Sequence, residues 1–377
     1  MWTFEQSRES RVDESSVAQG RGYRPSFLRS LLVTAFSPQR RGQRPSLLCC
    51  LLLSAFCLLT SFYCPAVGWL YTVQEVKPKV FVWISEDVLD LDGDPQFERA
   101  GTAGFIVTSE GVVVVNTTNS PFHGRELLYE IRHHSELPVR YVIDTNSSGE
   151  QILGNEVFTE LQAVVISSAK TQDEILHYQQ LLARRLADDE GDGKLRTRMR
   201  GFHITVPAQT FGGEMALRLG GQEIKLLTLL KNGSGDDAVV YLPAAKVLFL
   251  GELFQNGYFP RIDSRNVHDW IDTLRQVEKW DVEVYVPGHG APGGKKELAE
   301  FRQFLEWFGK EVATRFQQGK SLSQVKREVG TLAENYRWHA PELLSEEVEA
   351  VYKQTVKTPL KKAAPQPTAQ APPPGQP

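Results

Sequence analysis

The stretch VRYVIDTNSSGEQILGNEVF, residues 139–158, carries the strongest information about the fold. It begins with β-branched and aromatic residues, which predict a strand at 140–144, and ends with apolar residues that predict a short helix at 151–158. The turn between them is polar. Asp144 closes the strand, and we expect it to anchor this turn rather than to act in catalysis.

The sequence on either side of this stretch alternates between strand and helix patterns in two sets. In the first set, strands are predicted at 80–84, 103–108, 112–115 and 161–166, and helices at 121–134 and 171–186, with a charged loop at 188–200. The second set has predicted strands at 203–206, 214–219, 223–230, 238–242, 246–250 and 282–286, and helices at 266–278, 295–317 and 346–357. Two such sets predict one α/β domain of two similar halves, with sheets inside and helices outside.

The composition excludes several classes of protein. The 377 residues are 41% hydrophobic and 23% charged, which is typical of a globular protein and excludes whole-chain disorder and fibrous structure. The formal net charge of −4 argues against a nucleic-acid-binding protein, which usually has a basic excess.

The N-terminal region predicts export. All four cysteines lie between residues 49 and 64, so a cysteine-built zinc finger or disulfide framework is excluded after that point. The apolar run LLCCLLLSAFCLLTSFY, residues 47–63, follows an arginine-rich segment. This pattern is typical of a cleaved signal peptide or an uncleaved membrane anchor, with a buried core helix as the remaining alternative.

Four regions follow from these patterns. Residues 1–45 are predicted to be an Arg-rich disordered segment, 46–70 a signal peptide or anchor, 71–357 the folded domain and 358–377 a Pro-rich disordered tail. We therefore expect a membrane-anchored, secreted or periplasmic protein whose main domain lies outside the cytoplasm.

Four motifs in order resemble the metallo-β-lactamase superfamily. They are the 139–158 stretch, GFIVTSEGVVVVNTT at 104–118, GSGDDAVVYLPAAKVLFLGELF at 233–254 and VYVPGHGAP at 284–292. The resemblance covers about residues 76–352. It implies a four-layer αββα sandwich of two mixed β-sheets flanked by helices. The Gly-Asn pair at 154–155 is similar to a pair often seen in periplasmic-type branches of the family. The chain therefore resembles the branch of quinoprotein-relay zinc hydrolases.

The same resemblance implies a zinc centre that activates water, but most ligand positions hold other residues. The family's His-x-His-x-Asp-His motif and its third histidine fall, in order, on Asn146, Ser148, Glu150, Gln151 and Gly233. The bridging aspartate falls on Glu252, and the last histidine is retained as His289. Asn116 stands where the family has an aspartate at the end of its first hairpin. The three-histidine site is thus lost, and the second site is altered.

Three interpretations of the altered site remain open. In the first, Glu150, Glu252 and His289, with Gln151, form a residual site for one divalent metal, zinc or manganese, in which Glu150 or a metal-bound hydroxide is the base or nucleophile. In the second, no metal binds and the same side chains form a hydrogen-bonded cluster. In the third, they are merely solvated in an inert groove.

These interpretations give three hypotheses for function. The first is an exported binding module with a degenerate metal centre, non-catalytic or weakly active, that takes a small molecule or a protein in the groove between the halves. The second is a divergent metal-dependent hydrolase, and the third is a structural envelope protein. In each, the N-terminal segment contacts the membrane and no nucleic acid is bound.

Other polar and aromatic residues are given structural roles. His203 and His268 are expected to be structural, and Asp237 matches the family's structural aspartate. The aromatic stripe of the 295–317 helix is predicted to pack in the core: Phe301, Phe304, Trp307 and Phe308.

Overall fold

The computed structural model describes residues 71–85, 100–187, 203–229, 237–262 and 265–357. The predicted segments 1–45, 46–70 and 358–377, the loop at 188–200 and Gly233 lie outside these ranges. The described residues belong to one compact unit. No helix in the described ranges is long and apolar enough to cross a membrane.

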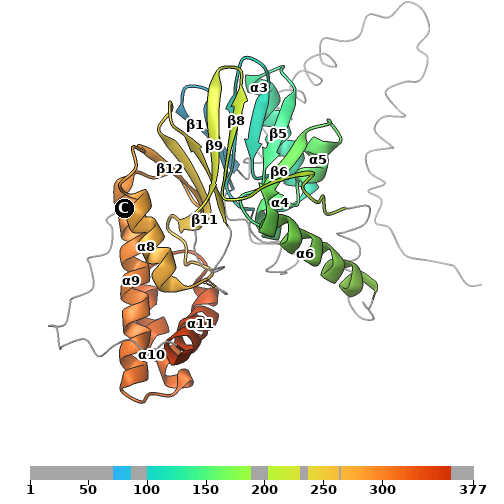
Figure 1. The fold of residues 1–377 in the computed structure, drawn as a ribbon. Coiled ribbons are helices and arrows are strands. Elements are labelled where there is room, and N and C mark those ends of the chain that lie inside the picture. Colours follow the sequence, from blue (N-terminus) through green and yellow to red (C-terminus); the bar gives the residue numbers. More distant parts are fainter. Residues whose placement is uncertain (1–70, 86–99, 188–202, 230–236, 263–264, 358–377) are drawn as a thin grey trace, which may run out of the picture. The chain divides into compact units, whose positions relative to one another are not determined.

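Two mixed sheets form the centre of this unit (Figure 1). The first follows chain order: β1 (Tyr71–Lys77), β2 (Val80–Ser85), β3 (Ala103–Val107), β4 (Val112–Val115), β5 (Val139–Ile143), β6 (Val164–Ser168) and β7 (Gln209–Phe211). The second has the order β12 (Val284–His289), β11 (Val247–Gln255), β10 (Ala238–Leu242), β9 (Gln222–Thr228) and β8 (Glu214–Leu219). Pairing is parallel from β4 to β7 and between β11 and β12, and antiparallel elsewhere.

Helices cover the outer faces of both sheets. Four helices connect strands of the first sheet along the chain: α3 (Pro121–His134), α4 (Gly149–Ile152), α5 (Asn155–Thr159) and α6 (Ala169–Ala187). Four helices gather beside the second sheet in Figure 1: α8 (Val267–Val277), α9 (Lys295–Gln317), α10 (Leu322–Ala333) and α11 (Leu344–Lys357). Short 3-10 turns at Glu334–Tyr336 and Pro341–Leu343 join the last two.

Side-chain alternation along the buried strands produces the layers. In β4, Val113 and Val115 belong to the core between the sheets, whereas Val112 and Val114 pack against α3 and α5. All four are fully buried, as expected of a strand with cover on both faces. The strand β11 alternates in the same way between the inter-sheet core and the core beneath α8 and α9. The predicted four-layer arrangement of two mixed sheets flanked by helices is therefore confirmed.

The aromatic stripe packs as predicted. Phe301, Phe304 and Phe308 are almost fully buried in the core between the second sheet and its helices, and Trp307 packs against that core from its edge. His268 is exposed in the first turn of α8. His133 lies in the last turn of α3, where a cation complements the helix dipole.

Two predicted elements differ from the structure. The strand predicted at 203–206 is wrong: these residues form no strand, and Ile204 and Val206 instead pack against α6 and its neighbours. The alternating apolar residues therefore pack against a helix here and do not form a strand. The single helix predicted at 151–158 is two helices, because Gly154 approaches the first sheet so closely that a Cβ would lie 2.0 Å from the Thr117 carbonyl oxygen.

Candidate functional site

Three of the predicted site residues meet at one end of the sandwich. Glu150 lies in the first turn of α4, Glu252 in β11 and His289 at the end of β12. Their potential ligand atoms all lie within 4.8 Å of one another. His289 Nε2 is 2.8 Å from Glu150 Oε2 and 3.6 Å from Glu252 Oε1. The sequence motifs that supplied these residues are thus brought together in space, and the cluster can bind a metal ion.

A backbone irregularity orients one of these side chains, Glu252. The β11–β12 pairing shifts register around Gly251, which has a φ of 52°. A bulge of this kind turns the following side chain, here Glu252, toward the end of the strand. A Cβ on Gly288 would lie 2.7 Å from Glu252 Oε1, so the absence of a side chain there allows this close packing.

Amide donors occupy both oxygens of Glu252. Gln151 Nε2 donates to Oε1 at 3.0 Å, and Gln255 Nε2 donates to Oε2 at 2.7 Å. Gln151 Nε2 also donates to the Gly288 carbonyl oxygen at 3.0 Å. Since both neighbours of this nitrogen are acceptors, the amide orientation follows from the hydrogen bonds. Gln151 therefore presents a donor to the cluster, and it would have to turn over to act as a metal ligand.

A cation and an aromatic ring lie beside the cluster. Arg261 Nη2 is 3.6 Å from Glu150 Oε1, and half of the arginine side chain is exposed. The Tyr258 ring is 5.6 Å from the His289 ring and stacks at 4.7 Å on His339. His339 is joined to this loop by a backbone hydrogen bond to Gly257. The segment that precedes α11 thus helps to hold the loop that carries Arg261.

Asn146 and Ser148, which the sequence resemblance matches to two histidines, lie in the turn before α4. Asn146 is buried; its Oδ1 accepts a hydrogen bond from the Ser148 N–H at 2.8 Å, and its Nδ2 donates to Thr145 Oγ1 at 3.1 Å. Ser148 is the residue before α4, and its side chain forms no capping hydrogen bond. Asparagine side chains commonly close turns in this way.

Asn116 fixes the start of the same loop. Its Oδ1 accepts from the Thr145 N–H and from Thr145 Oγ1, both at 3.0 Å, while its own backbone has a φ of 59°. Asparagine tolerates this left-handed conformation better than most residues.

Replacing Asn116 with alanine is expected to destabilise the domain by about 2 kcal/mol. The substitution leaves the buried Thr145 N–H without its acceptor and puts alanine in a left-handed conformation. Urea unfolding measures the change. The matched control is Asn116→Gly, which also removes the acceptor but keeps the backbone conformation accessible, so it should cost less than Asn116→Ala. Equal losses would contradict a backbone contribution.

Two aspartates near the site are buried for structural reasons. Asp144 Oδ2 accepts from Asn155 Nδ2 at 2.8 Å, and burial raises the pKa of the Asp144 carboxyl to about 8. Asp144 therefore ties the end of β5 to α5. Asp237 forms two hydrogen bonds with the Arg265 guanidinium, at 2.9 and 3.2 Å.

Sequence reasoning misses Gln255 and Arg261. Both follow the Gly-Glu pair of β11 along the chain, but neither lies in a motif of its own. Gln255 reaches Glu252 from the irregular end of β11, and the Arg261 contact depends on how the segment after β11 approaches α4. Residue spacing carries little information about either.

Comparisons with known proteins point to one family. The family model described as the metallo-beta-lactamase superfamily matches residues 97–289, just over half of the chain. A linear primary-alkylsulfatase from Pseudomonas sp. (strain ATCC 19151) is 24% identical to this chain. The match covers 52% of this chain but only 42% of the length of that enzyme. A metallo-beta-lactamase type 2 from Elizabethkingia meningoseptica is 26% identical over 58% of this chain and 78% of its own. A solved metallo-beta-lactamase from Pontibacter korlensis is 21% identical, with a TM-score of 0.48, over 63% of this chain and 99% of its own.

Proposed function

The chain belongs to the metallo-beta-lactamase superfamily, and from this premise we propose that it is a binding module of that fold in which a hydrogen-bonded Glu150–His289–Glu252 cluster replaces the hydrolytic metal centre. The observation that carries the proposal is the position of Arg261, 3.6 Å from Glu150. A guanidinium cannot donate a lone pair to a metal, and its fixed positive charge beside a ligand carboxylate opposes a divalent cation.

The three-histidine half of a zinc centre does not fit the residues present. Asn146 uses both ends of its amide in local hydrogen bonds, and Ser148 offers a hydroxyl rather than an imidazole. Zinc sites of the hydrolytic type rely on three protein ligands with nitrogen donors prominent among them. No step of hydrolysis is therefore derived through a metal at this position.

The carboxylates and the imidazole of the cluster have partners without a metal, whereas the buried Oε1 atoms of Gln151 and Gln255 have no hydrogen-bond partner in the described part of the chain. The His289–Glu150 distance of 2.8 Å is that of a hydrogen bond, and both oxygens of Glu252 accept from amide nitrogens. Charge-assisted bonds of this kind hold the three side chains in fixed positions. Arg261, half exposed at the edge, is the group of the cluster best placed to meet an incoming anion.

A divergent metal-dependent hydrolase is the second candidate. It is favoured by the convergence of one imidazole and two carboxylates within 4.8 Å, a donor set suited to one zinc or manganese ion. The matched relatives are named as an alkylsulfatase and a β-lactamase, so sulfate esters and β-lactams are the substrates to test. Binding a metal would require Arg261 to move and the His289–Glu150 hydrogen bond to open.

Metal analysis of the full chain separates the two candidates. We expect far less than one zinc or manganese ion per chain, no turnover of a chromogenic β-lactam or an alkyl sulfate, and no change of melting temperature on adding either metal. A real site would stabilise the protein by about 2.7 kcal/mol at a metal concentration one hundred times Kd.

The controls for the metal analysis use two histidines. His289→Ala removes a ligand of the candidate metal site, and His268→Ala removes a side chain that is exposed on α8. Stoichiometric metal that is lost in His289→Ala and kept in His268→Ala would contradict the proposal and establish the hydrolase-type site.

We also propose export through residues 46–70, with the described domain outside the cytoplasm. Support comes from the apolar run and the arginine-rich segment that precedes it. Protease accessibility of the domain in intact cells or spheroplasts tests this part of the proposal, and protection from protease would contradict it.

A further inference from the structure

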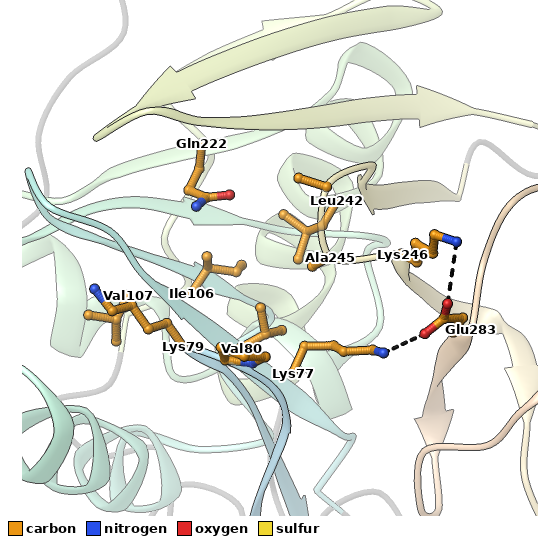
Figure 2. A pocket seen from close by; sticks show the side chains of 12 residues that line it. Lys77, Lys79, Val80, Ile106, Val107, Gln222, Leu242, Ala245, Lys246 and Glu283 are labelled. Carbon is orange, nitrogen blue, oxygen red and sulfur yellow. Dashed lines mark hydrogen bonds and ion pairs between the residues drawn. The ribbon is translucent and has the colours of Figure 1, made fainter.

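A cavity of about 380 Å³ opens at the other end of the sandwich from the Glu150–His289–Glu252 cluster (Figure 2). Its walls come from the turn between β1 and β2, the turn between β10 and β11, and the residue before β12. Lys246 lines the cavity and precedes Glu252 by six residues of β11, which is roughly 20 Å of strand. The cavity is therefore separate from the candidate site, and its volume is that of a small-molecule site.

The cavity combines an apolar floor with positive charge. Val80, Ile106 and Leu242 on the floor are buried, and Val107 and Ala245 extend it. The charged side chains that line the cavity are three lysines and one glutamate: Lys77, Lys79, Lys246 and Glu283. Such a surface matches a ligand that has both an alkyl part and an anionic group.

The three lysines are not equivalent. Lys77 and Lys246 both pair with Glu283, and Lys246 also pairs with Asp281. Figure 2 shows the first two lysines directed at Glu283, while Lys79 points away from it, toward Val107. The Lys79 ammonium has no acceptor within the described part of the chain. Lys79 is thus the cation available to a ligand.

Two of these lysines occupy backbone positions that disfavour them. Lys79 has a φ of 65° and Lys246 a φ of 56°. Glycine and asparagine adopt this left-handed conformation with less strain than lysine does. Lys79 follows Pro78 in a two-residue turn, at the position where a positive φ usually selects glycine or asparagine. Strained residues concentrate where a side chain has a role, and here both strained side chains line one cavity.

We propose that this cavity binds an amphipathic carboxylate of the medium-chain fatty acid type. Its carboxylate pairs with Lys79, and its alkyl chain lies on the partly exposed Val107 and Ala245, with the buried Val80, Ile106 and Leu242 beneath them. An exposed ion pair alone contributes little, so the apolar contact supplies most of the affinity and the lysine supplies the preference for an anion.

Calorimetric titration of the full chain with decanoate, below its micelle concentration, tests the proposal. We expect saturable binding of one decanoate per chain, with a Kd about three- to fivefold weaker in Lys79→Asn. Because asparagine tolerates a positive φ, the melting temperature of this variant should not fall. Lys246→Asn removes the second strained lysine, whose ammonium already pairs with Glu283 and Asp281, and should weaken binding less than Lys79→Asn does. Lys296→Asn, on the exposed face of α9, is the control and should leave the Kd unchanged.

Each alternative ligand gives a distinct result. Decanol binding as tightly as decanoate would overturn the role of the charge, and inorganic phosphate displacing decanoate at similar concentration would overturn the role of the apolar floor. Absence of saturable decanoate binding, or a Kd unchanged in Lys79→Asn, would overturn the proposal itself. None of these outcomes depends on the Glu150–His289–Glu252 cluster, so the proposed function is tested separately.

Discussion

Asp144→Asn is expected to stabilise the protein by several kcal/mol at pH 9 while changing its stability little at pH 4. Asp144 is fully buried, and burial raises the pKa of its carboxyl from 3.8 to about 8. Between these two pKa values the folded protein holds a proton that the unfolded chain releases. The free energy of unfolding of the native protein therefore falls as pH rises from about 4 to about 8.

The size of the effect follows from the pKa difference. At 1.36 kcal/mol for each pKa unit, the Asp144 carboxyl lowers stability by about 6 kcal/mol across this window. Asparagine keeps the shape of the neutral acid and an oxygen that accepts from Asn155 Nδ2, but it does not titrate. The difference between variant and native protein thus grows with pH and levels off above about pH 8.

Urea unfolding at pH 5, 7 and 9 measures this difference directly. Asp173→Asn, at an exposed position of α6, is the matched control and should follow the native protein at every pH. If Asp144→Asn and the native protein change in parallel from pH 5 to pH 9, the Asp144 carboxyl is not held neutral in the folded state.

The sequence predicts the centre of the fold better than its edges. Strands such as β4 and β10 are nearly continuous in apolar residues because they are covered on both faces, and this pattern is unmistakable in the sequence. The edge strand β1, YTVQEVK, is half exposed and mixed in composition, so its pattern predicts no strand. The three-residue β7 and the helix α10 also escape prediction. The position of β7 depends on its pairing with β6. The helix α10 carries its own signals, a capping box at Ser321 and Gln324 and an apolar face with Val325 and Val329, which the sequence prediction missed.

The sequence likewise predicts only part of the candidate site. Glu150, Glu252 and His289 can be identified from the sequence because each occupies a recognisable motif, in α4, in β11 and at the end of β12. Motif positions do not encode hydrogen-bond partners. The amides of Gln151 and Gln255 on Glu252, and the guanidinium of Arg261 beside Glu150, depend on loop paths that only the structure supplies.

Gly290→Ala is expected to destabilise the protein by about 3 kcal/mol or more and to displace His289. Gly290 has a φ of 94°, and a Cβ at this position would lie 2.1 Å from the Asn256 carbonyl oxygen. The obstacle is backbone, so it cannot be relieved by a change of rotamer. The backbone strain and the forced shift each cost about 1–3 kcal/mol.

The expected displacement follows from the hydrogen bond that closes this turn. Asn256 N–H donates to the His289 carbonyl oxygen at 3.0 Å, so moving Asn256 away from residue 290 also moves the backbone of His289. Since His289 Nε2 lies 2.8 Å from Glu150 Oε2, a shift of about 1 Å breaks the cluster. The NMR signals of the His289 imidazole should therefore change along with the unfolding free energy.

Gly319→Ala distinguishes the cost of a positive φ from the cost of a close contact between a Cβ and a backbone atom. Gly319 follows α9 with a φ of 76°, similar to that of Gly290, but a Cβ at Gly319 would have no atom within 4 Å in the described part of the chain, its two chain neighbours aside. Alanine there should cost only about 1 kcal/mol and leave the His289 signals unchanged. Equal losses of stability in the two variants would mean that the Gly290–Asn256 approach does not constrain the turn, and that His289 is held by its side-chain contacts alone.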